Sequence, residues 1–303
     1  MKAVRKWQLF LTLSSLFIMQ SSYAWWEAGH MIVANIAYSN LNSQAKRVVK
    51  EILPYMSHEN TLAHTYDYNQ AHPNYTMMAL STWPDDIHAF PNYDGSTRTW
   101  HYIEHAYSTD GTGYPALIPR DNVVWAIGEM KRLVALKKSN QNARVRALAY
   151  LIHFVGDIHQ PLHCTELHTK SLPDGDRGGN SFSIYHKEPN GDVLKNLHAL
   201  WDSGVQLFPN KNYPHNVNAP KDVHDLSLLI SKDYPKSYFT EQVKVLDPSV
   251  WEEESHQLGI DAHHTPMGAK PSNAYLMAAT DTVEKQMALA GYRLANLLNE
   301  ILN

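Results

Sequence analysis

A short stretch in the middle of the chain carries three side chains that could bind metal ions. His153, Asp157 and His163 lie within eleven residues of an otherwise apolar run. On a helix, His153 and Asp157 would lie one turn apart on the same face, where an imidazole and a carboxylate can hold one cation. Pro161 would end that helix, so His163 would lie beyond it and could reach a second cation. An ordinary hydrogen-bonded pair of His153 with Asp157 explains this stretch alone equally well.

The same spacing occurs a second time further along the chain. His198 and Asp202 are also four residues apart and have apolar neighbours. Two such pairs are harder to attribute to local hydrogen bonding than one. The repetition therefore favours metal binding by both segments.

Further candidate ligands lie beside tryptophans. The sequence Trp25-Trp-Glu-Ala-Gly-His30 would offer an α-amino group, a carbonyl oxygen and an imidazole if the chain were cleaved before Trp25, and Asp85 and His101 each lie close to a tryptophan. Each of these residues could instead be an aromatic anchor or a satisfied polar group near the core. The full set of candidate metal ligands is Trp25, His30, Asp85, His101, His153, Asp157, His163, His198 and Asp202.

The types of these ligands indicate which metal they would suit. Nitrogen and carboxylate ligands without a thiolate are typical of zinc sites that keep open coordination positions, and such sites are catalytic rather than structural. Three zinc ions would use the whole set if Asp157 bridged two of them. Cys164 directly follows His163, but a free cysteine usually behaves as a small buried hydrophobe, and we expect that role here.

The elements that would position these residues are mostly helices. Apolar residues at helical spacing predict helices over 31–52, 123–138, 143–159 and 274–302. Strand signals are few and short. We therefore expect an all-α fold, with a single mainly helical domain.

Two segments between the helices are predicted to be non-helical. Residues 182–186, which precede a Pro-Asn-Gly-Asp turn, could form half of a small hairpin. The piece from 165 to 192 is rich in turn-forming residues, so we expect a surface loop between two ligand-bearing helices.

Residues 1–24 have the features of a secretory signal peptide, namely a basic start, an apolar stretch and a small residue, Ala24, at the end. Cleavage there would make Trp25 the new N-terminus and leave residues 25–303 as the mature domain, secreted or in a bacterial periplasm. Later segments have no run of about 18 apolar residues, so we expect no stable membrane insertion.

Charge and cysteine usage narrow the possible functions. The formal net charge of -4 becomes -7 when the three positive charges of residues 1–24 are removed, because -4 minus 3 is -7. A chain without a run of Lys and Arg is not a general phosphate-binding protein, so phosphate recognition must be local, and bound metal ions would supply it. One cysteine allows no intrachain disulfide, so stability must come from the core and the metal.

The ordered set of motifs resembles the type I (S1/P1) nuclease family over nearly the whole mature chain. The motifs are Trp25 to His30, Trp-Pro-Asp85, Trp-His101-Tyr, His153-x3-Asp157-x5-His163, Gly178-Gly-Asn180 and Asn196-Leu-His198-x3-Asp202. Each piece is weak alone, whereas the set with its order and spacings is specific.

The resemblance implies an all-helical fold of the phospholipase C and S1/P1 nuclease type with three zinc ions per chain. Such an enzyme cleaves single-stranded RNA and DNA to 5'-phosphorylated products and removes the phosphate from 3'-nucleotides. One zinc would be held by Asp85, His101, His153 and Asp157, the second by Trp25, His30 and Asp157, and the third by His163, His198 and Asp202. Asp157 would bridge the first two ions, which activate a water molecule, and Asp85 would orient that water.

The resemblance also implies substrate contacts. Tyr102 would stack on a nucleobase and Glu104 would hydrogen-bond its edge, which suits unpaired bases because stacking needs an exposed base face. Asn180 could line the same pocket. Without the family pattern, Tyr102 would be a core residue, and Gly-Gly-Asn180 would be an ordinary turn.

One position departs from the family pattern. Nucleases of this family usually carry arginine three residues after the first zinc-binding aspartate, where it neutralises the phosphate in the transition state, but here that residue is His88. A neutral histidine offers one donor rather than a charged fork. We expect weaker charge stabilisation at His88, compensation by another cation, or activity shifted to acid pH.

Two other functions remain open at this point. A zinc-dependent phospholipase C shares the fold implied by the resemblance, but it would need an apolar rim facing lipid, and the sequence has no clear amphipathic membrane helix. A non-catalytic exported zinc-binding protein would not need an aromatic and an acidic residue beside its metal site. We therefore place the nuclease first, the phospholipase second and the binding protein third.

Overall fold

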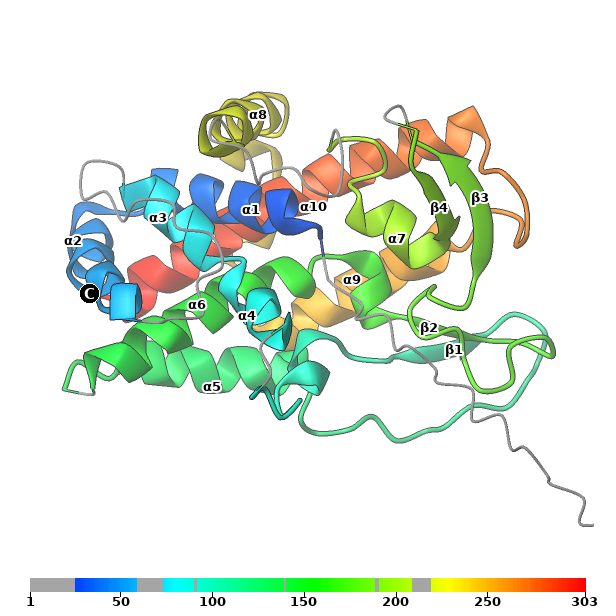
Figure 1. Cartoon of the computed structure of the whole chain (residues 1–303), viewed down its shortest axis with the longest axis horizontal. Helices are drawn as coiled ribbons and strands as arrows, with labels where there is room; N and C mark the ends of the chain where they lie inside the picture. Colours follow the sequence, from blue (N-terminus) through cyan, green and yellow to red (C-terminus); the bar gives the residue numbers. More distant parts are fainter. Residues whose placement is uncertain (1–24, 59–72, 90–91, 139, 189–190, 209–218) are drawn as a thin grey trace, which may run out of the picture.

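The computed structural model describes residues 25–58, 73–89, 92–138, 140–188, 191–208 and 219–303. The expected signal peptide, residues 1–24, lies outside the described residues. Within them the chain is mainly helical with two small sheets (Figure 1), which confirms the predicted fold class.

The α-helices are α1 (Glu27–Ser39), α2 (Ser43–Ile52), α3 (Pro73–Leu80), α4 (Trp83–Asp86), α5 (Val123–Ala135), α6 (Gln141–Asp157), α7 (Leu197–Asp202), α8 (Ala219–Asp233), α9 (Pro248–Ala262) and α10 (Asn273–Ile301). Short 3-10 turns span Leu53–His58, Ile87–Ala89, Arg98–His101, Pro161–Cys164, Lys236–Tyr238 and Gln242–Lys244.

The strands form two separate pairs. β1 (Ala106–Ser108) lies parallel to β2 (Glu166–His168), and β3 (Ser183–Lys187) lies antiparallel to β4 (Val193–Asn196). The antiparallel pair confirms the hairpin predicted at 182–186. The parallel pair was not predicted, because its strands are three residues each and far apart in the chain.

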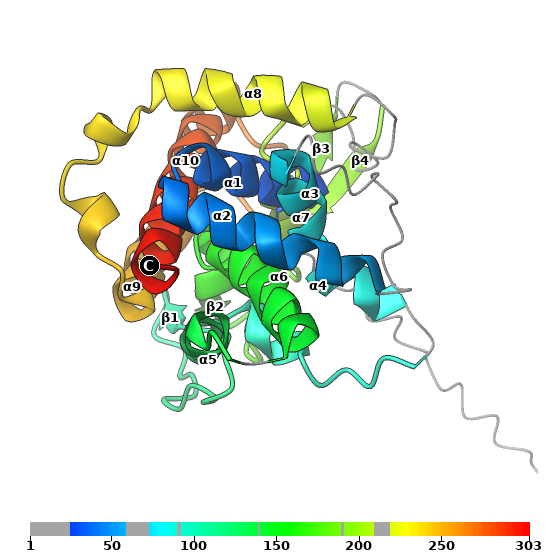
Figure 2. The ribbon, with the colours of Figure 1, turned by 90° about the vertical axis from the view of Figure 1, so that its left-hand side faces the viewer.

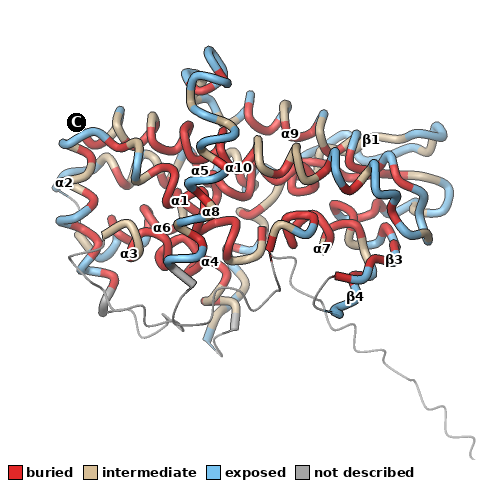
Figure 3. The backbone as a smooth tube through the Cα atoms, turned by 90° about the horizontal axis from the view of Figure 1, so that it is seen from above, coloured by how far each residue is buried: buried red, intermediate tan, exposed pale blue. Residues whose placement is uncertain are grey.

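The core of the fold surrounds α1. Every residue from Ala28 to Ala37 is buried, because α3, α6, α8 and α10 all pack against this helix. Figure 2 shows α8 lying across the top of the molecule with α1 and α10 beneath it. Buried residues continue along α6 and α10. In β3 and β4, at one end of the molecule, buried residues alternate with exposed ones (Figure 3).

Helices α1 and α10 pack closely against each other. A Cβ atom added at Gly291 would lie 2.6 Å from two side-chain carbons of Ile36 and 3.2 Å from the carbonyl oxygen of Val33. Glycine at this position therefore lets the backbones of the two helices approach each other.

The prediction of one helix over 31–52 was wrong. The first helix ends at Ser39, and α2 begins at Ser43 because the Asn42 side chain accepts a hydrogen bond of 2.8 Å from Ala45 N–H and caps the new helix. The other three predicted helices match α5, α6 and α10 to within three residues at each end.

The segment 165–192 is not simply a surface loop. All of β2 is buried, and so is Asp176, whose carboxylate accepts a 2.9 Å hydrogen bond from Leu167 N–H and lies 2.7 Å from His263 Nε2. A buried carboxylate with these partners ties the segment to α9. The segment also contributes Arg177, Gly178 and Asn180 to the lining of a surface pocket.

Gly291→Ala should destabilise the protein, because the added methyl group overpacks the contact between α1 and α10. We expect a loss of about 1–3 kcal/mol in the free energy of unfolding, measured by urea denaturation. Gly128→Ala is the matched control: it lies within α5, and an added Cβ meets nothing within 4 Å. This control should gain about 0.5–1 kcal/mol from helix propensity. Equal effects of the two substitutions would contradict the packing role of Gly291.

Candidate metal centre and substrate pocket

The Asp157 carboxylate lies between two groups of candidate ligands. Its Oδ1 is 3.5 Å from His30 Nε2, and its Oδ2 is 3.0 Å from His101 Nδ1 and 3.4 Å from His153 Nε2. Asp85 Oδ1 completes this group at 3.4 Å from His153 Nε2 and 3.6 Å from His101 Nδ1. The two oxygens of one fully buried carboxylate therefore face different imidazoles.

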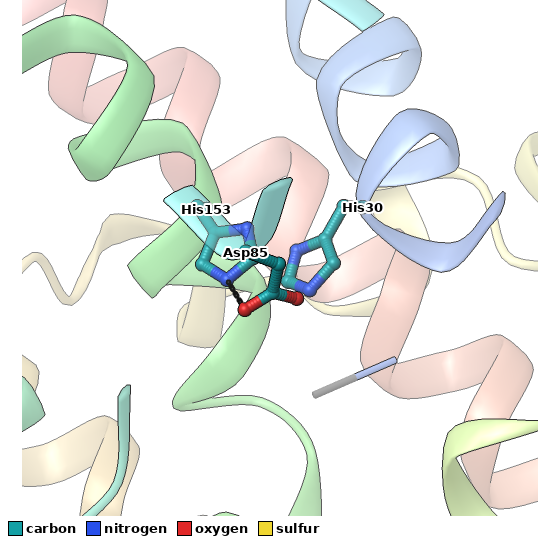
Figure 4. A group of neighbouring side chains, drawn as sticks. All are labelled: His30, Asp85 and His153. Carbon is teal, nitrogen blue, oxygen red and sulfur yellow. Dashed lines mark ion pairs between the residues drawn. The ribbon is translucent and has the colours of Figure 1, made fainter. Parts of the chain in front are cut away.

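These side chains come from three α-helices and one 3-10 turn. His30 projects from α1, Asp85 from α4, and His153 and Asp157 from α6. Figure 4 shows the His30 and His153 rings facing each other with the Asp85 carboxylate below them, and the ring centroids are 3.8 Å apart. We call the set of His30, Asp85, His101, His153 and Asp157 the bridged cluster.

A glycine in α6 makes room for this arrangement. A Cβ atom added at Gly156 would lie 2.7 Å from His30 Nδ1. Any side chain there would push His30 away from Asp157. The bridged cluster therefore depends on a bare backbone at this turn of α6.

A second group lies where α7 meets the 3-10 turn after α6. His163, His198 and Asp202 have candidate ligand atoms within 4.8 Å of one another. His198 Nε2 is 3.2 Å from Asp202 Oδ2, and the two imidazole centroids are 5.0 Å apart. We call these three residues the second cluster.

The histidine rings are oriented by backbone carbonyl groups. The Nδ1 atoms of three rings lie 2.5–2.8 Å from backbone carbonyl oxygens. His153 contacts Ser81, His163 contacts His101, and His198 contacts Gly178. A ring that donates its Nδ1–H to a carbonyl keeps a lone pair on Nε2, which is the usual arrangement of a histidine metal ligand. In these three rings Nδ1 therefore carries a proton, and Nε2 is the nitrogen left for a cation.

Several buried polar atoms of both clusters have no hydrogen-bond partner among the described residues. They are both ring nitrogens of His30, Asp85 Oδ1, His101 Nε2, both carboxylate oxygens of Asp157 and His163 Nε2. Buried polar atoms normally have partners, because leaving them unpaired costs free energy. Bound cations would satisfy the carboxylate oxygens and the one lone pair that each neutral imidazole offers, so the residues present fit a metal centre.

The electrostatic environment also suits cations. Burial raises the pKa of Asp157, while burial and the neighbouring His153 lower the pKa of His30 well below its usual range. Although burial opposes its charge, the carboxylates of Asp157 and Asp85 raise the pKa of His153 to about 9. The negative charges of Asp157 and Asp85 thus favour a positive charge at His153. A bound cation would supply that charge in place of the proton on His153.

Trp25 lies between the two clusters. It is fully buried, and its Nε1 donates a 3.1 Å hydrogen bond to the carbonyl oxygen of Gly156. The next residue, Trp26, donates its N–H to the carbonyl oxygen of Asp202 at 2.8 Å. The start of the described chain is thus attached to the ends of both α6 and α7.

A hollow beside the second cluster contains the predicted substrate contacts. With open solvent included, its space is about 410 Å³, and it is lined by Tyr102, Glu104, Leu162, His163, Arg177, Gly178, Asn180 and His198. The structure therefore brings Tyr102, Glu104 and Asn180 together beside two candidate metal ligands.

His88 does not line this hollow. Its ring stacks on Tyr93 at 4.5 Å between centroids and meets the His101 ring at 5.2 Å. Burial, followed by the influence of His101, lowers the pKa of His88 to about 4, so the imidazole is neutral near pH 7. Arg98 lies 5.8 Å from the same Tyr93 ring and is a cation in this neighbourhood. Its charge could provide the compensation that we expect for His88.

Sequence reasoning missed two residues of the site. Arg177 lines the hollow and directly precedes the Gly-Gly-Asn motif, so its position was the available signal. Gln160 lies inside the stretch that contains the ligands; its Nε2 donates a 2.7 Å hydrogen bond to Asp202 Oδ1, and its Oε1 accepts one of 2.7 Å from Leu162 N–H. Gln160 thus holds a carboxylate of the second cluster in place.

The family model described as S1/P1 Nuclease matches residues 25–303. The chain belongs to the S1/P1 nuclease family. Endonuclease 3 of Arabidopsis thaliana is 25% identical over 316 residues, covering 97% of this chain and 96% of the relative. Nuclease S1 of Aspergillus oryzae is 24% identical, covering 96% of both proteins, and Nuclease P1 of Penicillium citrinum is 24% identical, covering 91% of this chain and 97% of the relative.

Membership of the S1/P1 nuclease family makes the protein a nuclease, a hydrolase acting on nucleic acids. It also indicates the use of metal ions, for which the bridged and second clusters provide candidate sites. None of the helices that the structure describes is long and apolar enough to cross a membrane.

Gln160→Ala should weaken metal binding at the second cluster, because Asp202 would lose the donor that orients its carboxylate. Loss of such a partner typically lowers metal affinity by about 10- to 100-fold. Competition between the protein and a chelator for Zn²⁺ would measure the change. Gln257→Ala is the control, since exposed Gln257 is on α9 and its side chain donates to exposed Glu253. Equal Zn²⁺ affinities of the two variants would refute the positioning role of Gln160.

Proposed function

We propose that this nuclease is a trinuclear zinc phosphoesterase that hydrolyses single-stranded RNA and DNA to 5'-phosphorylated products and dephosphorylates 3'-nucleotides. The observation that supports it most is the buried Asp157 carboxylate, whose two oxygens face different imidazoles and have no hydrogen-bond partner among the described residues. A carboxylate in this situation suits two cations better than one.

The ligands divide among three zinc ions as follows. The first ion would be held by Asp85, His101, His153 and Asp157, the second by the Trp25 terminus, His30 and Asp157, and the third by His163, His198 and Asp202. Nitrogen and oxygen donors without thiolate favour zinc with open positions. When bound, the ions supply positive charge that polarises water and the phosphate ester.

The protein's own groups orient the reactants. Asp85 has one oxygen, Oδ1, without a hydrogen-bond partner among the described residues, although His153 Nε2 lies 3.4 Å away. This oxygen accepts a hydrogen bond from the attacking water and holds it in line with the phosphorus atom. The buried imidazoles around it exclude bulk water, so the hydrogen bond acts in a medium of low dielectric constant.

Tyr102 provides the preference for single strands. It is half-buried in the wall of the hollow, with Glu104 and Asn180 nearby. A base that stacks on this ring must first leave its partner, and duplex DNA resists this. Unpaired bases therefore reach the second cluster more easily than paired ones.

We further propose that the mature chain begins at Trp25 after export to the periplasm or the medium. Two contacts support a start at this residue: the indole of buried Trp25 donates to the Gly156 carbonyl oxygen, and Trp26 N–H donates to the carbonyl oxygen of the candidate ligand Asp202.

Metal removal should abolish turnover and lower the melting temperature. We expect about three zinc ions per mature chain and hydrolysis of single-stranded DNA, RNA and 3'-AMP, all lost with excess chelator and restored by Zn²⁺, because the ions bind only the folded state. Elemental analysis, product analysis and calorimetry on one preparation would measure this. Nuclease activity in metal-free protein would refute the proposal, and release of phosphocholine alone from phosphatidylcholine would identify a phospholipase C. Zinc without turnover of any substrate would leave a binding protein.

Tyr102→Ala should raise KM for single-stranded DNA by about 5- to 100-fold, because base stacking on an aromatic ring contributes about 1–3 kcal/mol. Tyr102→Phe keeps the ring and should stay close to the parent. Tyr185→Ala removes an aromatic ring that is 56% exposed on β3, outside the hollow, and serves as the control. If Tyr102→Ala and Tyr185→Ala had the same KM, stacking on Tyr102 would be excluded.

A further inference from the structure

Arg177 is held in an unusual backbone conformation at the hollow. Its φ is 57°, and the next two residues, Gly178 and Gly179, also have positive φ values of 59° and 83°. The turn is closed by Asn180, whose backbone N–H and side-chain amide donate to the Arg177 carbonyl oxygen at 3.2 and 2.9 Å. A residue other than glycine is disfavoured in this region, and such positions cluster at functional sites.

The same turn builds the wall of the hollow. A Cβ atom added at Gly178 would lie 2.3 Å from the carbonyl oxygen of Leu162, and the Gly178 carbonyl oxygen contacts His198 Nδ1 at 2.5 Å. The backbone there is fixed against two other segments. The exposed Arg177 side chain is therefore attached to a rigid point of the rim.

Glu104 is the second charged group of the hollow. It is half-buried, and burial followed by the nearby Glu166 carboxylate raises its pKa, while the positive charge of Arg177 opposes this shift. Within the described residues, neither the Glu104 carboxylate nor the Arg177 guanidinium makes a hydrogen bond or an ion pair with another side chain. Both groups remain available for a ligand.

The two groups have opposite hydrogen-bonding character. An ionised carboxylate only accepts hydrogen bonds and takes two adjacent donors, whereas a guanidinium only donates and suits two adjacent acceptors. A base that stacks on Tyr102 presents its edge to both of them. The base that matches must offer two neighbouring donors and two neighbouring acceptors.

Guanine alone among the four bases meets both conditions. Its O6 and N7 are adjacent acceptors, the preferred partners of arginine, and its N1–H and N2–H₂ are adjacent donors. Adenine places the N6 amino group beside N7, so one donor would face the guanidinium. Cytosine offers a single amino donor, and uracil a single N–H.

From this complementarity we infer that the hollow of Tyr102, Glu104 and Arg177 selects guanine at the nucleotide whose 3'-phosphate is cleaved. Arg177 pairs with O6 and N7, and Glu104 pairs with N1–H and N2–H₂. The inference rests on the proposed function, because it assigns a base to the substrate of the same site. It makes Arg177 a specificity-determining residue, which the motif pattern does not indicate.

The test compares kcat/KM for the four 3'-nucleotides by the zinc-loaded mature enzyme. We expect kcat/KM for 3'-GMP to exceed that for 3'-AMP by about 5- to 100-fold, which is the discrimination that one good bidentate pair provides. Two analogues separate the contacts. The 7-deaza analogue of 3'-GMP lacks the N7 acceptor for Arg177, and 3'-IMP lacks the N2 amino donor for Glu104, so each should lose part of the preference.

Variants assign the preference to residues. Arg177→Gln should bring the ratio of 3'-GMP to 3'-AMP turnover close to one and make the 7-deaza substitution silent, while Arg177→Lys should retain part of the ratio. Glu104→Gln should make the change from 3'-GMP to 3'-IMP silent. Arg47→Gln is the control for charge: Arg47 is exposed on α2, at the end of the molecule opposite β1 and β2 (Figure 1). Its ratio should equal that of the parent.

Two results would overturn the inference. Equal kcat/KM for all four 3'-nucleotides would do so while leaving the proposed function intact. A uniform loss for all bases in Arg177→Gln, with the ratio unchanged and a weaker dependence on salt, would show that Arg177 contacts a phosphate instead.

Binding measurements keep the test informative if no substrate is turned over. In that case the proposed function fails, and the affinities of 5'-GMP and 5'-AMP for the zinc-loaded protein are compared by calorimetry. Tighter binding of 5'-GMP, lost in Arg177→Gln, would support the guanine pocket by itself. Equal affinities would overturn it.

Discussion

The structure depends on holding one fully buried carboxylate, that of Asp157, among imidazole rings. A buried charge costs several kcal/mol unless its partners are arranged closely around it. Here the partners are imidazoles on three separate segments, each within about 3.5 Å or less of one Asp157 oxygen. The bare backbone at Gly156, the stacking of His30 on His153, and the capped and buried helices all serve to keep those groups at this separation.

The same constraint explains why polar backbone groups appear inside the core. Carbonyl oxygens of Ser81, His101 and Gly178 each face the Nδ1 atom of one histidine, so its Nε2 lone pair points at the cluster. Gln160 does the same for the carboxylate of Asp202. Ligand side chains are flexible, and these contacts remove that freedom before a cation arrives. The free-energy cost of ordering these side chains is therefore met during folding and does not weaken the binding of a cation.

Helical spacing predicted α5, α6 and α10 well, because each has a continuous apolar pattern of three or more turns. It failed at 31–52, where α1 is buried on all sides and the break depends on the capping side chain of Asn42. The parallel pairing of β1 with β2 was beyond local patterns, since Ala106 pairs with Glu166 sixty positions away. For the site, residue type and spacing identified the candidate ligands. Gln160 and Arg177 could not be identified in this way, because their roles depend on where the fold places them. A glutamine and an exposed arginine have many ordinary roles, and only the fold places them beside Asp202 and Tyr102.

The attachment of Trp25 to α6 and of Trp26 to α7 has a consequence for how the protein folds. The candidate ligands extend from the first described residue to Asp202, and neighbours in space come from distant parts of the chain. In small zinc domains a cation can collect ligands from one short segment and nucleate folding, but here large loops must close before two ligands of the bridged cluster meet. Cations that bind these clusters would therefore bind late in folding, when the core is almost complete. A newly made chain must reach nearly its final shape by hydrophobic packing alone, which requires the apolar contacts of α1, α6 and α10 to suffice without the metal.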